Sequence, residues 1–161
     1  MKANDKIQYM YTAVIEIPKN CDRRIHWGNR PENRGTFEDL GPLYDVIPVN
    51  DGKMPMAYGF LKGTVGTDGE GDEVDVLIFS NKEFKTGDEA TVTLFGILKR
   101  EDGDHKVLAH DDTVSYDSFQ NLDPKLQKVT LDFHGSKHKI TSIEEKAVAE
   151  EYVKATVVQG K

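Results

Sequence analysis

Strand-like stretches dominate the first two thirds of the chain. Residues 11–17 are rich in β-branched and aromatic side chains, and Pro18 directly after them is typical of the end of a strand. Residues 76–79 form a second apolar run of strand length. In contrast, residues 28–41 are polar, contain glycine and proline, and show no sustained period. They predict a long loop of the kind that often carries function.

A hairpin is predicted further along the chain. Residues 91–98 and 106–109 have the composition of two strands, and residues 100–105 between them contain the turn signal Asp102-Gly103. This connection places two acidic side chains, those of Asp102 and Asp104, at the end of a strand.

The last third of the chain predicts two helices. Asp123 followed by Pro124 is typical of a helix start, and three apolar residues then recur at helical spacing. These residues are Leu126, Val129 and Phe133. Ser142 and Glu145 have the spacing of a capping box for a second helix, on which three further residues share one side. These are Val148, Tyr152 and Ala155. Strands first and helices last predict a mainly β fold, a small β-barrel or a curled sheet, with two flanking C-terminal α-helices.

Size and composition narrow the class of protein. With 161 residues and 37% hydrophobic content, the chain is long enough for one domain, and we expect residues 1–161 to form it. A net charge of −7 argues against nucleic acid as a partner. The single cysteine, Cys21, excludes an intrachain disulfide. The polar start and the lack of an apolar run of about 20 residues predict a cytoplasmic protein without a membrane span.

The strongest chemical signal is a cluster of carboxylates at residues 68–75, immediately before the apolar run 76–79. Its members are Asp68, Glu70, Asp72, Glu73 and Asp75. Carboxylates held this close resist joint ionisation, so a folded site made from them implies a bound metal, shared protons or a solvated loop. If the strand begins near Asp75, that side chain shares a face with Leu77 and points away from the layer of Val76.

A second acidic turn lies in the predicted hairpin. Asp102, Asp104 and Lys106 alternate along it, and an Asp-Gly-Asp turn is ordinary by itself. Its combination with the first cluster and with two other blocks is far less ordinary. These blocks are Val-Ile-Glu-Ile-Pro at residues 14–18 and Pro-Met-Ala-Tyr-Gly-Phe at residues 55–60.

In this order and at this approximate spacing, the blocks resemble the soluble inorganic pyrophosphatases of the metal-dependent OB-fold family. The resemblance extends over about residues 14–109 and also rests on Asp-Glu-Val-Asp-Val-Leu at residues 72–77. It implies a five-stranded, OB-like closed β-barrel with the active site in its cavity. It further implies Mg²⁺-dependent hydrolysis of pyrophosphate to two orthophosphates by a metal-activated water. Several Mg²⁺ ions, with Mn²⁺ or another divalent ion as a substitute, and a homo-oligomer are expected on the same ground.

The resemblance also implies roles for individual residues. Asp72 and Tyr58 are the expected catalytic residues, with Asp72 helping to generate the nucleophile, and Asp75 is expected to bridge two metal ions. The expected metal ligands are Glu16, Asp68, Glu70, Asp72, Asp75, Asp102 and Asp104. The expected substrate-binding residues are Arg24, Tyr58, Lys106 and Lys137. One ligand stays open, because counting back from Asp75 selects Glu70 whereas counting forward from Tyr58 selects Asp68.

The chain departs from the family pattern around the phosphate site. The family's Lys-x-Glu pair corresponds to Arg24 and His26, so a cation is kept while the acid is lost. The arginine expected before the Tyr-Gly-aromatic motif falls near Val46, where no cation stands. Two other functions therefore stay open: a metal-dependent phosphohydrolase that acts on another phosphoanhydride, and a non-catalytic OB-type binding module.

Overall fold

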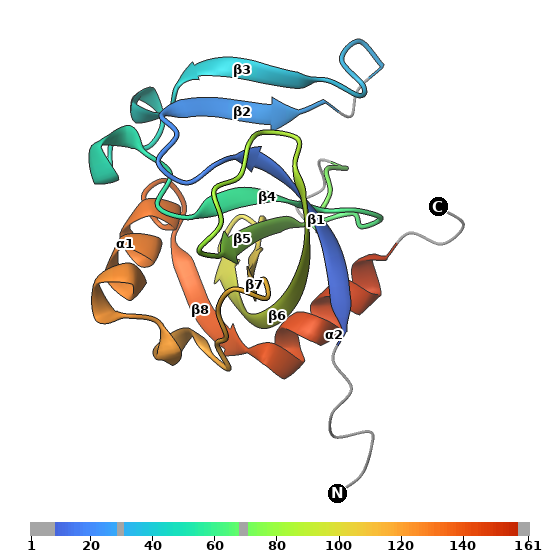
Figure 1. Ribbon diagram of the computed structural model, residues 1–161, viewed down its shortest axis with the longest axis vertical. Coiled ribbons are helices and arrows are strands. Elements are labelled where there is room, and N and C mark those ends of the chain that lie inside the picture. The colour runs from blue at the N-terminus through green and yellow to red at the C-terminus, as the bar shows by residue number, and fades with distance from the viewer. Residues whose placement is uncertain (1–8, 29–30, 68–70, 158–161) are drawn as a thin grey trace, which may run out of the picture.

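The computed structural model describes residues 9–28, 31–67 and 71–157, which fold into a set of strands and two α-helices (Figure 1). The strands are β1 Met10–Ile17, β2 Arg23–Trp27, β3 Phe37–Pro42, β4 Ala57–Leu61, β5 Asp75–Phe79, β6 Glu89–Arg100, β7 Lys106–His110 and β8 Ile140–Glu145. The α-helices are α1 Pro124–His134 and α2 Lys146–Thr156. Short 3₁₀ helices occupy Leu43–Asp45, Asn50–Gly52 and Phe119–Asn121.

Five of the strands close into a barrel at the centre of the molecule (Figure 1). Their order is β1-β4-β5-β7-β6, and the first part of β6 pairs back with β1 to complete the circuit. The last part of β6 pairs with β8, which extends the sheet beyond the barrel. β5 and β7 run parallel, whereas the other barrel pairs are antiparallel. The predicted five-stranded closed barrel is confirmed.

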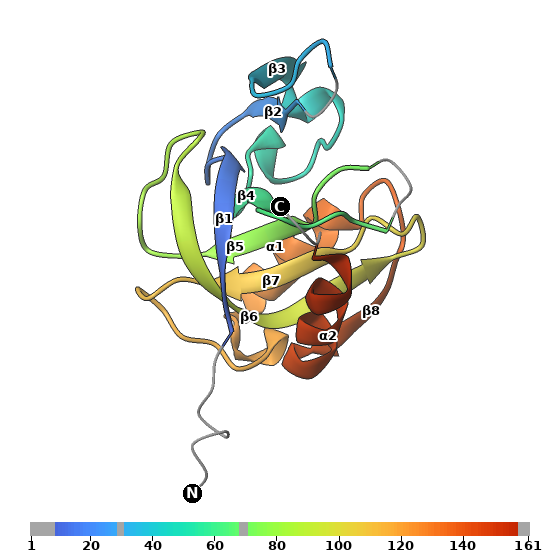
Figure 2. The ribbon, with the colours of Figure 1, turned by 90° about the vertical axis from the view of Figure 1, so that its right-hand side faces the viewer.

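The two helices flank the barrel and help to form two apolar clusters. α2 packs along β6 and β8 (Figure 2). Val153 of α2 belongs to the same cluster as Val76 of β5, whereas Phe133 of α1 belongs to the other cluster, with Leu77. A fully buried side chain of this size stabilises the fold by about 1.5–3 kcal/mol. Because neighbouring residues of a strand point to opposite sides, Asp75 at the start of β5 shares the side of Leu77, as the alternation predicted.

Gly59 allows β1 and β4 to approach closely. It pairs with Ile15 across the two strands. A Cβ atom at this position would lie 1.8 Å from the carbonyl oxygen of Val14, so packing requires the glycine of the Tyr-Gly-Phe block. The close pairing places Tyr58 beside the end of β1, where Glu16 stands.

The predicted long loop at residues 28–41 is wrong in its second part, where β3 pairs with β2 in a separate two-stranded sheet. This hairpin lies above the barrel in Figure 1. Trp27 of β2 packs on Phe37 at 4.8 Å between ring centroids and stacks on Phe60 of β4 at 5.9 Å. The hairpin is held by this aromatic contact with the barrel, which the local pattern of polar residues does not reveal.

The first predicted helix is confirmed. The Asp123 side chain accepts a hydrogen bond from the Lys125 backbone N–H at 2.8 Å, which caps the first turn, and Phe133 is fully buried. No helix within the described parts of the chain is both long and apolar enough to span a bilayer.

The second predicted helix begins later than expected. Ser142 and Glu145 do not form a capping box, because they belong to β8 and pair with β6. The last part of β6 offers a row of backbone hydrogen-bond partners, and this pairing overrides the local capping signal. Val148 and Tyr152 pack against the core as expected, but Ala155 is exposed and the buried side of α2 is centred elsewhere. The buried residues are Ala149, Glu150, Val153 and Thr156.

Candidate active site

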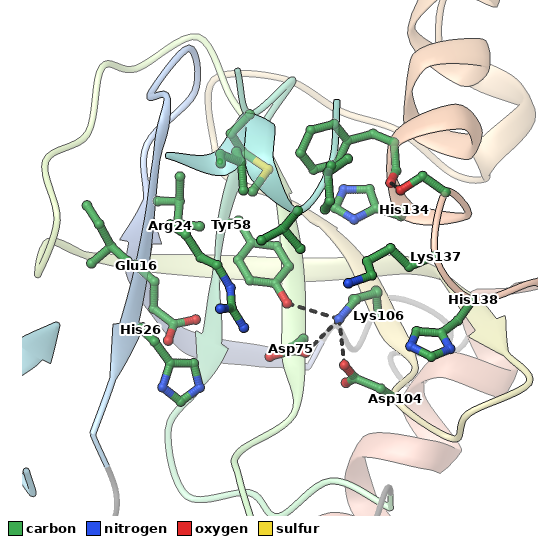
Figure 3. A pocket seen from close by; sticks show the side chains of 18 of the residues that line it. Glu16, Arg24, His26, Tyr58, Asp75, Asp104, Lys106, His134, Lys137 and His138 are labelled. Carbon is green, nitrogen blue, oxygen red and sulfur yellow. Dashed lines mark hydrogen bonds and ion pairs between the residues drawn. The ribbon is translucent and has the colours of Figure 1, made fainter. Parts of the chain in front are cut away.

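A cavity of about 360 Å³ opens between the barrel, the β2–β3 hairpin and the segment after α1 (Figure 3). It brings together eight of the residues predicted for the site. They are Glu16, Arg24, Tyr58, Asp72, Asp75, Asp104, Lys106 and Lys137. In Figure 3, Glu16, Arg24 and His26 lie on one side of the cavity, and Lys137 and His138 lie on the other. Residues far apart in the sequence therefore face one another across a single polar cavity.

Lys106 is at the centre of this group. Its ammonium nitrogen lies 2.8 Å from Asp75 Oδ2 and 3.0 Å from Asp104 Oδ2, and it donates to the Tyr58 hydroxyl oxygen at 2.9 Å. The parallel register fixes one of these contacts, because Asp75 and Lys106 pair at the starts of β5 and β7. Lys106 is only 3% exposed, so its charge is compensated by these partners rather than by water.

Burial sets the electrostatics of these groups. It raises the pKa of the Asp75 carboxyl to about 7, and the nearby Lys106 ammonium only partly opposes this rise. Burial alone would lower the pKa of Lys106, but the charges of Asp75 and Asp104 hold it well above its usual value. Burial and the charge of Asp75 also raise the pKa of Tyr58 well above 10, so its phenol stays protonated. The centre of the cavity is thus a protonated lysine shared by two carboxylates and a neutral phenol.

Glu16 forms the second acidic position of the cavity. It is 4% exposed, and its Oε2 accepts a hydrogen bond from the Trp27 backbone N–H at 2.8 Å. Burial, followed by repulsion from Asp75, raises the pKa of Glu16 to about 8. The Trp27 contact ties the end of β1 to β2, and β2 is the strand that carries Arg24 and His26 into the cavity wall.

Asp102 departs from the expected arrangement. It is not among the residues that line the cavity, and its carboxylate is directed at Arg100, the last residue of β6. The Arg100 Nε donates to Asp102 Oδ1 at 3.0 Å, and Nη2 donates to Oδ2. These hydrogen bonds lower the pKa of Asp102 to about 2. Asp68 and Glu70 lie outside the described residues, so the choice between them stays a prediction.

Four of the basic or imidazole side chains that line the cavity were not predicted for the site: His26, Arg100, His134 and His138. The His134 ring stacks on Tyr58 with centroids 5.9 Å apart, and burial lowers its pKa well below 6.5, so the imidazole is neutral. The sequence did offer a signal for Arg100, because a basic residue that directly precedes an acidic turn is a candidate for binding an anion there. Nothing local marked His134, which reaches the cavity only because α1 ends there.

The cavity fits a magnesium site in its chemistry. Among the described residues, no three His, Cys, Asp or Glu side chains are arranged to hold one ion. Mg²⁺ does not need such a cage, because it keeps several waters and is usually bound by one or two carboxylates together with substrate phosphates. Asp75 and Asp104 already converge on one cation, the Lys106 ammonium. These two carboxylates, with those of Asp72 and Glu16 in the same cavity, are the donors that would hold metal ions.

Comparison with known proteins decides the family. A family model described as inorganic pyrophosphatase matches residues 13–159. The chain belongs to the inorganic pyrophosphatase family. An inorganic pyrophosphatase of Helicobacter pylori is 40% identical over 128 residues, which cover 74% of this chain and 66% of that protein. One of Ureaplasma parvum is 36% identical over 102 residues, which cover 60% of this chain and 50% of that protein. The chain thus spans half to two thirds of the length of these relatives.

Solved structures of inorganic pyrophosphatases share the fold. That of the Ehrlichia chaffeensis protein superposes with a TM-score of 0.76 at 23% identity, and covers 92% of this chain and 93% of that one. That of the Thermus thermophilus protein gives a TM-score of 0.76 at 22% identity, with 97% and 94% covered. The likeness in fold thus extends over nearly the whole chain.

Proposed function

We propose that this chain hydrolyses inorganic pyrophosphate to two orthophosphates with the help of magnesium ions. The observation that carries the proposal is the charge pattern of one cavity in a pyrophosphatase barrel. Its carboxylates are those of Glu16, Asp72, Asp75 and Asp104, and its cations are Arg24, Arg100, Lys106 and Lys137. A phosphoanhydride needs cations around its oxygens, and metal ions need carboxylates. A cavity lined by both kinds of group therefore suits a metal complex of pyrophosphate better than it suits pyrophosphate or a metal ion alone.

Each residue has a task that follows from its place. When bound, magnesium would lower the pKa of a coordinated water and offset the charge on phosphate oxygens. Asp72, on the cavity wall, would orient the attacking water and accept its proton. Because Lys106 donates to the Tyr58 oxygen, the phenolic O–H can donate in turn to a phosphate oxygen. Lys106 itself would offset the charge on the leaving phosphate.

Arg24 and Lys137 complete the proposed phosphate clamp. Arg24 reaches the cavity from β2, and Lys137 follows α1 on the other side, so the two cations face each other across the space (Figure 3). A guanidinium can bind two phosphate oxygens at once, whereas an ammonium acts as a point charge. In the proposed clamp, Arg24 would therefore select for the geometry of the phosphate group, whereas Lys137 would tolerate different positions of it.

A second candidate substrate class is favoured by Val46. This apolar side chain lines the cavity at the place where the family resemblance implies an arginine. Without that cation the wall is less specific for a compact tetra-anion, and it is more open to another phosphoanhydride such as tripolyphosphate or a nucleoside triphosphate.

The test is release of phosphate by the purified chain from pyrophosphate, tripolyphosphate and a nucleoside triphosphate, each with and without Mg²⁺. We expect magnesium-dependent release from pyrophosphate, and loss of that release in Asp72→Asn. Turnover of only the other two compounds would support the second candidate. No release from any of them, with binding of pyrophosphate retained, would replace hydrolysis with a binding function.

We further propose that the chain acts in the cytoplasm as a homo-oligomer, as the family resemblance implies. Several large apolar side chains support assembly, since they are exposed in the single chain. They include Met10, Leu40 and Tyr44. Sedimentation velocity over a range of concentrations is the test, and a single monomeric species at every concentration would contradict the oligomer.

A further inference from the structure

Arg100 lies between the cavity and Asp102. It ends β6, lines the cavity, and its side chain is 12% exposed. Asp102 follows in the turn and does not line the cavity. A metal ligand needs its oxygens directed at the metal, whereas both oxygens of Asp102 accept from the guanidinium. The same oxygens also lie 3.2 Å from the Asp104 backbone nitrogen and 3.7 Å from the His138 Nε2.

The guanidinium is held in one orientation by contacts with three residues from two segments. Nε and Nη2 donate to the two oxygens of Asp102, which is the bidentate geometry that best fixes an arginine plane. Nη2 is also 3.5 Å from Asp104 Oδ2, and Nη1 donates to the His134 carbonyl oxygen at 3.4 Å. The arginine is therefore anchored to the acidic turn and to the end of α1.

This anchoring leaves binding capacity on the cavity side. An arginine has five N–H donors, and the hydrogen bonds of Arg100 within the described residues use three of them. A second donor remains on Nη1, and the second donor of Nη2 lies near Asp104 in an ion pair. The contact of Nη1 with His134 is long, so Nη1 can exchange it for a stronger acceptor at little cost. A phosphate oxygen in the cavity is such an acceptor, and a preorganised guanidinium loses little entropy on binding it.

The charge balance of the wall shows why such a contact matters. Val46 supplies no cation, and the Lys106 charge is already shared by Asp75 and Asp104. Among the described residues of the wall, the positive charges that remain for a phosphoanhydride are those of Arg24, Lys137 and Arg100, and Arg100 is anchored by a part-buried ion pair with Asp102.

We propose that Arg100 is a substrate-binding residue that contacts a phosphate group of the phosphoanhydride, and that Asp102 is the positioning residue that orients it rather than a metal ligand. This proposal rests on the proposed function and deepens it. It assigns the binding of one end of the substrate to a side chain that the family resemblance did not imply. It also reduces by one the set of metal-binding carboxylates expected from the sequence.

The experiment compares Arg100→Met, Asp102→Asn and the double variant with the parent. Arg23→Met is the control, because the Arg23 Nε donates to both oxygens of Asp39 on the exposed β2–β3 hairpin and Arg23 does not line the cavity. Binding of imidodiphosphate, a pyrophosphate analogue with a P–N–P bridge, is measured by calorimetry in Mg²⁺, together with KM and kcat for pyrophosphate. Binding of Mn²⁺ without substrate is measured by electron paramagnetic resonance.

We expect Arg100→Met to weaken imidodiphosphate binding and to raise KM by about tenfold or more, and Asp102→Asn to do so by about threefold. The double variant should be no weaker than Arg100→Met, because Asp102 acts only through Arg100. Mn²⁺ binding without substrate should stay within about twofold of the parent in each variant. Arg23→Met should match the parent throughout.

Two results would overturn the proposal. One is unchanged imidodiphosphate binding in Arg100→Met. The other is a loss of Mn²⁺ binding of about tenfold or more in Asp102→Asn but not in Arg100→Met, because metal affinity depends on the number of ligand carboxylates. If circular dichroism shows that Arg100→Met is unfolded, Arg100→Lys is measured in its place. Lysine keeps the positive charge but cannot donate to two oxygens in one plane, so this variant should still weaken binding of imidodiphosphate. If the parent binds imidodiphosphate through Arg100 but releases no phosphate, hydrolysis fails while this assignment stands.

Discussion

The two ends of the parallel pair β5 and β7 each carry a carboxylate, and the pKa values of the two carboxylates shift in opposite directions. At the start of the strands, Asp75 faces Lys106, and burial raises the pKa of Asp75 to about 7. Beyond the other end, Asp111 is 5% exposed, yet its pKa is lowered although burial opposes the change. For Asp75 the effect of burial on the pKa outweighs that of its ammonium partner, whereas for Asp111 hydrogen bonds to Ser80 and Thr113 outweigh burial.

The partners of Asp111 satisfy it completely. Its oxygens accept hydrogen bonds from the hydroxyls of Ser80 and Thr113 and from the Thr113 backbone N–H at 3.0 Å. Asp75 has one strong donor, Lys106, and must share it with Asp104. One end of the strand pair thus uses a carboxylate to hold loops together. The other end keeps carboxylates short of donors, as a site that binds cations requires.

The largest effect is expected when the charge of Asp75, the carboxylate at the cavity end of the strand pair, is removed. Asp75→Asn should lower the rate of pyrophosphate hydrolysis by about 10²–10³-fold, because the site loses a charge that holds the metal complex. The rate is measured at saturating Mg²⁺ on protein whose circular dichroism matches the parent. Activity within about threefold of the parent would place Asp75 outside the proposed chemistry.

The same change at the other end should affect stability instead. Asp111→Asn replaces a carboxylate oxygen by an amide that cannot accept, so we expect a loss of about 2 kcal/mol in the free energy of unfolding at pH 7. In a chain of this size that corresponds to a melting temperature lower by roughly 4–8 °C. Activity per folded molecule should not change. A large loss of activity with unchanged stability would reverse the roles of the two ends.

The effect of Asp111→Asn should also depend on pH. The pKa of Asp111 in the folded state is lower than in the unfolded state, so its stabilisation is present above the unfolded value near pH 4 and is lost as the pH falls through the folded value. The difference in unfolding free energy between parent and variant should shrink between pH 5 and about pH 3. Urea titrations at these values test this, and a constant difference would contradict the lowered pKa.

The sequence predicts the position of a site residue well where that position depends on residues nearby in the chain. Asp75, Asp104 and Lys106 could be placed together, because strand alternation, a turn motif and the family resemblance all agree there. Arg100 and Asp102 were adjacent in the same turn, but their direct pairing depends on side-chain geometry that spacing does not set.

Contacts made by distant segments account for the remaining errors. β3 was read as loop because its stability comes from Trp27 packing on Phe60 of the barrel. Ser142 was read as a helix cap because its pairing with Lys99 of β6 is a long-range contact. His26 enters the cavity only through the β2–β3 hairpin that was missed. In each case tertiary packing overrode a local pattern.

A smaller effect is expected at the shared lysine. Tyr58→Phe removes the hydroxyl that accepts from Lys106 and leaves the two carboxylate contacts intact. The loss of one hydrogen bond to a charged group should lower kcat/KM by about tenfold. Steady-state kinetics at saturating Mg²⁺ measure this, with the melting temperature as the control for packing of the ring. An unchanged kcat/KM would show that the phenol only fills space beside His134.

The smallest expected effect is at Ser80, and it tests whether the Asp111 end depends on its number of donors. Ser80→Ala removes the hydroxyl that donates to Asp111 and also accepts from the Lys82 backbone N–H at 2.9 Å. Thr113 still satisfies Asp111, so the free energy of unfolding should fall by only about 1 kcal/mol, half of the effect of Asp111→Asn. Urea denaturation of the two single variants and the double variant resolves this. If Ser80 acts through Asp111, the double variant should be less destabilised than the sum of the single changes. If the losses in the free energy of unfolding add in full, Ser80 stabilises its own turn and does not act through Asp111. Thr113 alone would then lower the pKa of Asp111.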